Sequence, residues 1–394
     1  MNQLLKTVID QIKPSEEETK KIEDLAIELM NKANDLSDKK FDSLIVGSVA
    51  KKTFLKGADI DLFLKFNTDT DLKKEGLDIA KKILPNGKEL YAQHPYLRGE
   101  IKGIGIDVVP CYSIENSTKP LSAVDRTPFH TEWVKKNISG MEDDIRLTKQ
   151  FLKGCGAYGA SSAVGGFSGY LVEILCIKYG GFEKLVNEIA NWKPPLIIDK
   201  IINAPNSPIM LADPVDYNRN VAAGVTLKGL GSAVLASKAF LAKPSLDFFF
   251  PKNKKRPFQG FVTTVILPHP GGNEETALPW LQRQGRKIYN AISDFEPIAW
   301  NVNLEEKGYL IFETASIELP EIIPHKGPAP WDDGAMDFLK KYPEASLNED
   351  RLETGKAPRN ATISQVVLEL LPKAEIKKGL AKGAQPIQRV PWLD

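Results

Sequence analysis

Two aspartates, Asp59 and Asp61, interrupt an apolar run in the stretch GADIDLFLKF. Alternate side chains of an extended strand point to opposite faces, so the two carboxylates would lie side by side while Ile60, Leu62 and Leu64 face the other way. Adjacent carboxylates repel each other, and a divalent cation with hard oxygen ligands relieves that repulsion. The pattern therefore predicts a strand that binds a metal ion.

A third aspartate, Asp107, interrupts a second apolar run, IGIDVVPCY. Three carboxylates on neighbouring strands are the minimum ligand set for two divalent metal ions, which can activate an attacking hydroxyl and neutralise a leaving pyrophosphate. Gly47 and Ser48 precede the first acidic strand, where a turn would bring backbone N–H groups and a hydroxyl onto phosphate oxygens. Together these features indicate nucleotidyl transfer.

Two simpler explanations compete with a metal site. A D-x-D pair arises about once by chance in a chain of this length, and Asp69 and Asp71 in the polar stretch NTDTDL indicate only a solvated turn. Charges on an edge strand can also protect a sheet against aggregation. Two separate apolar runs that each carry an aspartate weaken the second explanation.

The bulk composition sets the class of protein. A chain of 394 residues is long enough for two to three domains, and its 52 Lys and Arg balance 51 Asp and Glu, so any basic surface must be local. Three scattered cysteines indicate buried thiols in a reducing compartment, and four histidines without zinc spacing argue against a zinc site. Without a signal core or a membrane-spanning stretch, the expected location is cytoplasmic, with no membrane partner.

The order of predicted elements indicates an α+β multidomain fold. Residues 1–137 read as a small domain with a mixed sheet: helices over 2–12 and 15–36, a strand over 41–47, the acidic strand, a helix over 71–84 and two strands over 96–112. Ser15 and Glu18 form a capping box for the second helix.

From about residue 138 the pattern becomes helical. Residues 138–245 read as a helical central domain, in which Ser168 caps one helix and DPVDYNRNVAAGV leads into another that ends near Leu241. Residues 246–394 resume with strand, helix, strand and strand, which is typical of half of a ferredoxin-like or RNA-recognition-type domain, and end in an irregular, helical tail. A basic stretch precedes this domain: Lys252, Lys254, Lys255 and Arg256.

Longer strings carry a resemblance. The stretch LIVGSVAKKTFLKGADIDLFL resembles the head of the DNA polymerase beta-type nucleotidyltransferase superfamily. The strings IDVVPCY, AVDRTPFHTEWV, GFSGYLVE and DPVDYNRNVAA closely resemble the archaeal, class I CCA-adding enzyme family of tRNA nucleotidyltransferases. The resemblance covers residues 44 to about 224 and extends more loosely to the C-terminal part.

The resemblance implies template-independent addition of CCA to the 3′ end of tRNA from CTP and ATP, with two Mg²⁺ ions and release of pyrophosphate. Its partners would be the acceptor arm and 3′ end of tRNA, recognised by shape and phosphates, and residues 246–394 would bind tRNA. The three predicted domains would be the nucleotidyltransferase head, the neck and the C-terminal body with its tail. A homodimer is left open.

The resemblance also assigns individual residues. The catalytic metal ligands would be Asp59, Asp61 and Asp107, with Asp107 near the primer 3′ hydroxyl. The nucleotide-binding residues would be Gly47, Ser48, Lys51, Thr127, His130, Lys149, Tyr158 and Arg219, of which Arg219 helps to read the incoming base. The chain departs from the family where Lys51 replaces an expected arginine, Asp59 a common glutamate and Gly165-Gly166 an arginine, and where its tail is short.

Two other functions fit parts of the pattern. A poly(A) polymerase or oligoadenylate-type transferase shares the chemistry of the head but adds ATP repeatedly and does not use CTP. A catalytically silent RNA-binding protein could share the fold, although three retained aspartates would then be uncompensated like charges.

Overall fold

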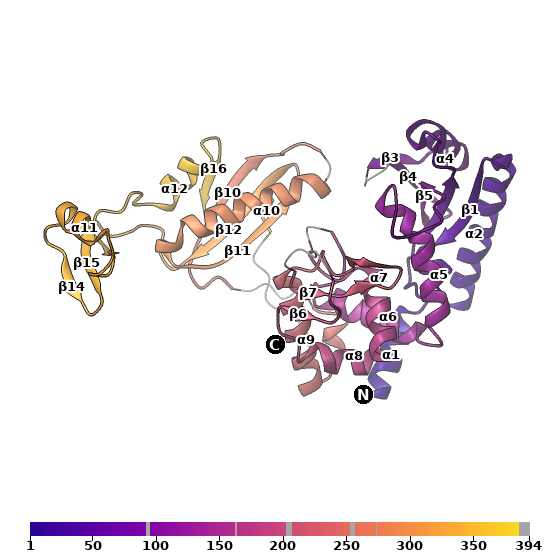
Figure 1. Ribbon diagram of the computed structural model, residues 1–394, viewed down its shortest axis with the longest axis horizontal. Coiled ribbons are helices and arrows are strands. Elements are labelled where there is room, and N and C mark those ends of the chain that lie inside the picture. The colour runs from indigo at the N-terminus through magenta and orange to yellow at the C-terminus, as the bar shows by residue number, and fades with distance from the viewer. Residues whose placement is uncertain (92–94, 162–163, 202–206, 253–256, 273, 386–394) are drawn as a thin grey trace. The chain divides into compact units, whose positions relative to one another are not determined.

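The computed structural model describes residues 1–91, 95–161, 164–201, 207–252, 257–272 and 274–385. These residues form two compact units that divide after Lys252 (Figure 1). Both units combine helices with sheets, which confirms the α+β multidomain class. The finer division at residues 137 and 245 stays a prediction.

Two helices begin the chain, as the sequence predicts: α1 (Asn2–Ile12) and α2 (Glu16–Ser37). The predicted capping box at the start of α2 is present, because Ser15 and Glu18 exchange side-chain and backbone hydrogen bonds of 2.7 and 3.1 Å. Helix α1 packs into the core of the helical elements, whereas α2 packs on the first sheet.

The first sheet has five strands in the order β1-β2-β5-β4-β3. Their bounds are β1 (Phe41–Val46), β2 (Ile60–Phe66), β3 (Lys88–Tyr91), β4 (Pro95–Ile101) and β5 (Ile104–Tyr112). Only β2 and β5 run parallel, so the sheet is mixed, as predicted. Helix α2, the π-helical turn η1 (Leu72–Gly76) and α4 (Leu77–Ile83) share one apolar core with it.

Helices dominate the rest of the first unit. They are η2 (Ala123–Arg126), α5 (Thr127–Asn137), α6 (Glu142–Gly154), α7 (Gly169–Tyr179), α8 (Phe182–Ile189), α9 (Leu227–Ala242) and η3 (Leu246–Phe248). Ser168 caps α7 as predicted, by accepting a hydrogen bond of 3.1 Å from the Leu171 N–H. Phe151 of α6 packs edge to face against Phe182 and Phe240, which ties α6 to α8 and α9.

Arg146 of α6 joins the helices to the sheet domain. Its buried guanidinium donates hydrogen bonds to the backbone carbonyls of Lys52 (2.5 Å) and Phe54 (2.9 Å), in the loop before β2. That loop forms one wall of the cavity described below, so α6 fixes its position.

The stretch at residues 213–225 leads into a helix as predicted, because α9 follows it and ends close to Leu241. Within that stretch, residues 212–220 form a hairpin that was not predicted, β8 (Ala212–Asp213) and β9 (Asp216–Asn220). Asp213 accepts a hydrogen bond of 3.1 Å from the Val215 N–H, and such side-chain bonds to the backbone favour a turn over a helix. A further short pair is β6 (Leu196–Ile197) with β7 (Ile209–Met210).

The second unit contains an antiparallel sheet in the order β11-β12-β10-β16. Along the chain its elements are β10 (Phe261–Pro268), α10 (Glu274–Ala291), η4 (Ser293–Phe295), β11 (Pro297–Leu304), β12 (Lys307–Thr314), α12 (Ile363–Leu370) and β16 (Glu375–Lys378). Helices α10 and α12 share one apolar core with the sheet. The predicted strand, helix, strand and strand are all present.

A small domain lies between β12 and α12 in the chain. It holds β13 (Ile323–Lys326), α11 (Ala335–Lys341), β14 (Ser346–Asn348) and β15 (Arg351–Lys356), with sheet order β13-β15-β14. The expectation of an irregular, helical stretch is confirmed by the helices α11 and α12, but the three short strands were not predicted. These strands are short and largely exposed, so their sequences carry little of the apolar alternation that predicts a strand.

Three smaller predictions can be placed. All three cysteines are buried free thiols, as expected. Among the described helices, none combines the length and apolarity needed to cross a membrane. Most of the predicted basic stretch, residues 253–256, lies outside the described residues.

Candidate active site

Asp61 and Asp107 lie on the two central, parallel strands of the first sheet. The register of β2 and β5 pairs these two residues directly. Ile60, Leu62 and Leu64 of β2 have no exposed surface, so their burial fixes the opposite face of the strand and turns the acidic face outward. The predicted pairing of acids from two separate apolar runs is therefore present.

Asp59 comes directly before β2 and lies beside this pair. Two glycines make room for the acids: a Cβ on Gly47 would lie 2.0 Å from Asp61 Oδ2, and a Cβ on Gly105 would lie 2.2 Å from Asp59 Oδ1. Gly47 also has a positive φ of 68°, which side chains rarely adopt, and it begins the short helix α3 (Gly47–Ala50). Gly47 thus both turns the chain and admits a carboxylate.

The electrostatic environment of the acids is unfavourable to their charge. Burial and the neighbouring Asp107 and Asp59 raise the pKa of Asp61 to about 7. Burial also raises the pKa of Asp107, although Arg98 opposes that rise. Arg98 of β4 forms ion pairs with Asp59 and with Asp107 Oδ2, the latter at 3.1 Å. One arginine therefore compensates part of a charge that three acids share.

Two observations indicate that these three acids are suited to bind a hard divalent cation. Their donors are all carboxylate oxygens, which Mg²⁺ and similar ions prefer. Asp107 Oδ1 is buried and has no hydrogen-bond partner, so a ligand position is available on it. As the side chains stand, no three His, Cys, Asp or Glu groups of the described chain converge on one point.

A cavity of about 300 Å³ opens in front of the acids. It brings together five of the predicted residues, Asp59, Asp61, Ser48, Lys149 and Tyr158. The loop between α3 and β2 and the helix α6 supply the rest of its wall. Gly47, Lys51 and Asp107 stand beside the cavity and do not line it.

Lys51 and Lys149 meet on one buried acid, Glu173 of α7. Lys51 Nζ donates to Glu173 Oε2 at 2.5 Å, and Lys149 Nζ donates to Oε1 at 3.1 Å. Thr53 adds a hydrogen bond of 2.8 Å to Oε1. Although burial opposes the charge of Glu173, Lys149 and Lys51 hold the pKa of this carboxylate below its ordinary value. We refer to these four side chains as the Glu173 cluster.

His130 and Arg219 meet on a second buried acid, Asp213 of β8. His130 Nε2 lies 3.0 Å and Arg219 NH1 2.7 Å from Asp213 Oδ2, and the Tyr170 hydroxyl donates to Oδ1 at 3.0 Å. The His130 ring stacks on Tyr170 with centroids 3.9 Å apart. Burial lowers the pKa of His130 even though Asp213 opposes that shift. We refer to these four side chains as the Asp213 cluster.

Helix α7 connects the two clusters. Tyr170 and Glu173 are three residues apart, which places them on the same side of a helix. Thr127 is the last of the eight predicted nucleotide-binding residues to be located. It begins α5, which carries His130 one turn later. Sequence reasoning did not identify Glu173, Asp213 or Tyr170. A lone glutamate inside the apolar helix GYLVEILCIKY was the available signal for the first.

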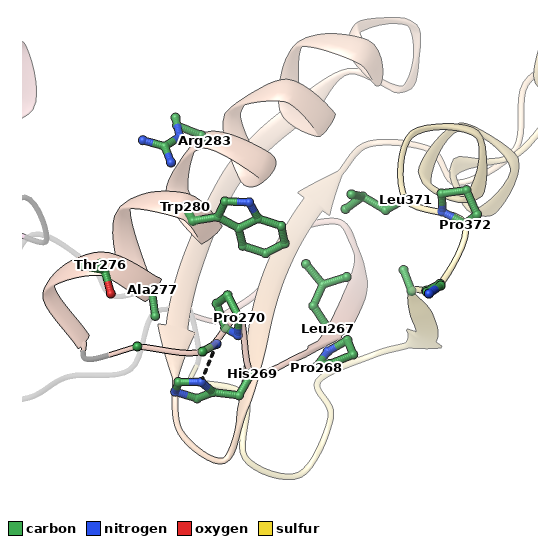
Figure 2. A pocket seen from close by; sticks show the side chains of 14 residues that line it. Leu267, Pro268, His269, Pro270, Thr276, Ala277, Trp280, Arg283, Leu371 and Pro372 are labelled. Atoms are coloured by element: carbon green, nitrogen blue, oxygen red, sulfur yellow. Dashed lines mark hydrogen bonds between the residues drawn. The ribbon is translucent and has the colours of Figure 1, made fainter.

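A larger cavity, of about 840 Å³, lies within the second unit (Figure 2). Trp280 and Arg283 line it from α10, and Leu371 lines it from the segment after α12. The His269 ring accepts a hydrogen bond of 3.0 Å from the Gly271 N–H at its edge. No aspartate or glutamate is among the described residues that line it, so it offers no carboxylate ligands.

Comparison with known proteins gives three matches to family models. Residues 27–130 match a nucleotidyltransferase domain, residues 143–250 the second domain of tRNA nucleotidyltransferase, and residues 260–378 the C-terminal domain of CCA-adding enzyme. The matches follow one another along the chain and leave only short segments unmatched.

Full-length relatives agree with these matches. A CCA-adding enzyme of Methanococcus maripaludis is 38% identical over 86% of this chain and 84% of its own. One from Thermoplasma volcanium is 34% identical over 95% and 90%, and one from Thermococcus gammatolerans is 34% identical over 96% and 91%.

Proposed function

Because this chain belongs to the archaeal CCA-adding enzyme family, we propose that Asp59, Asp61 and Asp107 are the ligands through which it holds two Mg²⁺ ions. The chain is a tRNA nucleotidyltransferase: it adds CCA to the 3′ end of tRNA from CTP and ATP, without a nucleic-acid template, and releases pyrophosphate. The observation that carries the residue assignment is the direct pairing of Asp61 with Asp107 on parallel strands, with Asp59 beside them.

The three acids would divide the ligand positions between them. The partnerless Oδ1 of Asp107 supports a role for this residue as a metal ligand, and the resemblance would place it near the primer hydroxyl. Ions bound here would lower the pKa of the attacking 3′ hydroxyl and neutralise the leaving pyrophosphate. Asp61, with its pKa of about 7, would hold a proton in the metal-free site more readily than an ordinary aspartate.

The residues around the acids would hold and orient the triphosphate. Ser48 offers its hydroxyl into the cavity beside Asp59 and Asp61. The Glu173 cluster places two lysine charges against one carboxylate, which leaves a net positive charge beside the cavity, and Lys149 of this cluster lines the cavity itself. Tyr158 closes the same wall. Positioning and positive charge are what in-line phosphoryl transfer demands of a protein.

The Asp213 cluster would serve base selection. Arg219 is fixed through one end of its guanidinium by buried Asp213, while 38% of its side chain stays exposed. A guanidinium held in one plane can present its remaining donors to the acceptors of a pyrimidine or purine edge. His130, stacked on Tyr170, would complete this side of the site together with Thr127.

The C-terminal unit would bind tRNA. Its strand, helix, strand, strand, helix and strand, with sheet order β11-β12-β10-β16, support its assignment as a ferredoxin-like domain into which the β13–β15 domain is inserted. Within the first unit, we propose a nucleotidyltransferase head over residues 1–137 and a helical neck over 138–245. A cytoplasmic location belongs to the same proposal, because tRNA, CTP and ATP are found there.

One incubation tests the function. Purified protein, Mg²⁺ and a tRNA transcript that lacks its last three nucleotides receive CTP and ATP singly and together. We expect the transcript to gain two nucleotides with CTP alone and three with CTP and ATP together. With ATP alone, we expect no product that is three nucleotides longer. A ladder of adenylates, or no product, would overturn the function.

A further inference from the structure

The larger cavity, in the second unit, takes no part in the proposed nucleotidyl transfer. Its volume is about 840 Å³, against about 300 Å³ for the cavity in front of the acids, and lies within the range of roughly 300–1,000 Å³ that is usual for sites that bind small organic groups. Much of its wall is apolar: Leu267, Pro268, Pro270, Ala277, Leu371 and Pro372. Such a wall favours an apolar, planar group.

Trp280 of α10 supplies an aromatic surface to this cavity. Figure 2 shows its indole extending from the helix into the space between α10 and Leu371. The same side chain packs against the apolar core that α10 shares with the sheet, so the core holds the ring in place. Nucleobases stack on such rings whatever their sequence, because every base has a π face.

The polar groups of the wall attract anions. Arg283 and Lys373 both line the cavity with exposed side chains, and neither forms an ion pair or a hydrogen bond with a side chain that the structure describes. Their donors are therefore available to a ligand. His269 Nδ1 accepts the Gly271 N–H at 3.0 Å, which leaves the proton of the neutral ring on Nε2 and makes that atom a donor. With no carboxylate among the described residues of the wall, the cavity suits a negatively charged ligand.

These walls favour a nucleotide of RNA over a peptide or a free nucleoside triphosphate. An extended peptide binds by adding a strand to an open sheet edge, but β10, which leads into the wall, pairs with β12 on one side and β16 on the other. The prolines of the wall also lack the N–H that such pairing needs. A free triphosphate arrives with Mg²⁺, which usually takes a protein carboxylate as well, and the described wall has none. A nucleotide within RNA brings one aromatic base and one phosphate charge.

We propose that this cavity binds one unstacked nucleotide of the tRNA, with the base on Trp280 and the phosphate on Arg283 and Lys373. This assignment rests on the proposed function, in which the C-terminal unit binds tRNA. Proteins recognise RNA largely at bases that are splayed out of the helix, where an aromatic side chain can reach the face of the base. The Nε2 donor of His269 offers a hydrogen bond to the same nucleotide. The cavity thus adds affinity for tRNA and does not touch the reacting groups.

Binding of the tRNA transcript without CCA to the full chain, measured by gel shift, tests the base contact. Trp280→Leu keeps an apolar side chain against the core but removes the ring, and should weaken binding by about 5- to 150-fold, the range of one base–aromatic stack. Trp280→Phe keeps an aromatic face and should stay within about 5-fold of the wild type. Phe261→Ala removes an exposed aromatic ring at the other end of β10; it is the matched control and should change nothing. Equal affinity of Trp280→Leu and the wild type would overturn the proposal.

The salt dependence of tRNA binding tests the phosphate contact. Arg283→Gln and Lys373→Gln should each reduce the slope of log Kobs against log salt concentration by up to about 1, because each removes a cation that neutralises a phosphate. Both side chains are exposed, so these variants test the site even if Trp280 also supports the core. Lys184→Gln, an exposed lysine on α8 of the first unit, is the control and should leave the slope unchanged. An unchanged slope in both cavity variants would overturn the phosphate contact.

Two further measurements identify the occupant. In steady-state kinetics, Trp280→Leu should raise the KM for tRNA and leave the KM for CTP unchanged. If calorimetry shows instead that Trp280→Leu weakens binding of CTP or ATP but not of tRNA, the occupant is a free nucleotide and the proposal fails. If the variant weakens neither, the cavity does not bind nucleotides, and the proposal fails as well. If wild-type protein binds tRNA through Trp280 but adds no CCA, the proposed function fails while this contact stands.

Discussion

Two sets of buried acids in the first unit differ in the direction of their pKa shifts. Glu173 and Asp213 have almost no exposed surface, yet each lies against at least two cationic or hydrogen-bond-donating side chains that hold its pKa below the ordinary value despite burial. Asp61 and Asp107 lie beside them with raised pKa values, because burial adds to the repulsion between neighbouring carboxylates. Similar groups, a short distance apart along connected elements, thus carry opposite shifts.

The difference distinguishes acids that hold the structure together from acids available to a ligand. A buried acid whose oxygens are all satisfied stabilises its neighbours and has nothing left to bind. An acid that keeps a raised pKa and an unpaired oxygen stores unfavourable energy that a cation can relieve. The four predictions below test this contrast, from the largest expected effect to the smallest.

The largest effect should come from the available acids. Asp107→Asn and Asp61→Asn keep the size of the side chain but remove a metal ligand, so CCA incorporation should fall by about 10³-fold or more. Binding of tRNA, measured by gel shift, should stay within roughly 2-fold, and the free energy of unfolding should not fall, because repulsion is relieved. Near-normal turnover in either variant would contradict the assignment of the metal ligands.

The satisfied acids should behave in the reverse manner. Glu173→Gln leaves Lys51 and Lys149 buried without their counter-ion, and the free energy of unfolding in urea should fall by about 3–5 kcal/mol. Glu188→Gln, an exposed acid on α8, is the control and should stay within about 0.5 kcal/mol of the wild type.

A second substitution separates charge from packing. Removing one lysine as well, in Glu173→Gln with Lys51→Met, should recover part of the lost stability, because one fewer buried charge lacks a partner. If the single variant is as stable as the wild type, Glu173 is not the structural acid that its contacts indicate.

The acids that are available to a ligand can be predicted from the sequence better than Glu173 and Asp213, whose oxygens already have partners. Asp59, Asp61 and Asp107 break apolar runs of strand type, so a local pattern exposes them, and the strands themselves follow from alternation and turns. Asp213 and Tyr170 take their roles from partners on other elements: Asp213 pairs with Arg219 across a hairpin that short-range patterns do not predict. Glu173 joins Lys51, 122 positions earlier in the chain. Contacts at such separations arise from the fold, so residue types alone do not reveal them.

The pH dependence of stability should show the contrast directly in protein freed of metal by EDTA. Asp61 has a folded pKa of about 7 against an ordinary 3.8, so its stabilising contribution is complete below about pH 4 and is lost as the pH rises through about 7. Between pH 5 and 8, the free energy of unfolding of Asp61→Asn should therefore exceed that of the wild type by about 1–3 kcal/mol, allowing for partial exposure of the site. For Glu173, whose pKa is lowered, the sign is opposite, and its contribution is lost on acidification. If the difference in the free energy of unfolding between Asp61→Asn and the wild type does not vary with pH, the pKa of Asp61 is not raised.

Arg98 tests how far the available acids are already compensated. Its guanidinium pairs with Asp59 and Asp107 but leaves Asp107 Oδ1 without a partner, so it competes with a cation for only part of the site. The paired groups Arg98 and Asp59 are more than a third exposed, which makes each pair worth less than about 1 kcal/mol, and Arg98→Gln should tighten Mn²⁺ binding by only about 2- to 5-fold. Lys102→Gln removes the same charge at the turn after β4, where Lys102 pairs with Glu28, and should leave Mn²⁺ affinity nearly unchanged. Electron paramagnetic resonance of free Mn²⁺, without nucleotide or tRNA, measures both variants. Weaker Mn²⁺ binding in Arg98→Gln would show instead that the arginine holds the acids together for the ion, and the acids would then belong to a site organised before the metal arrives.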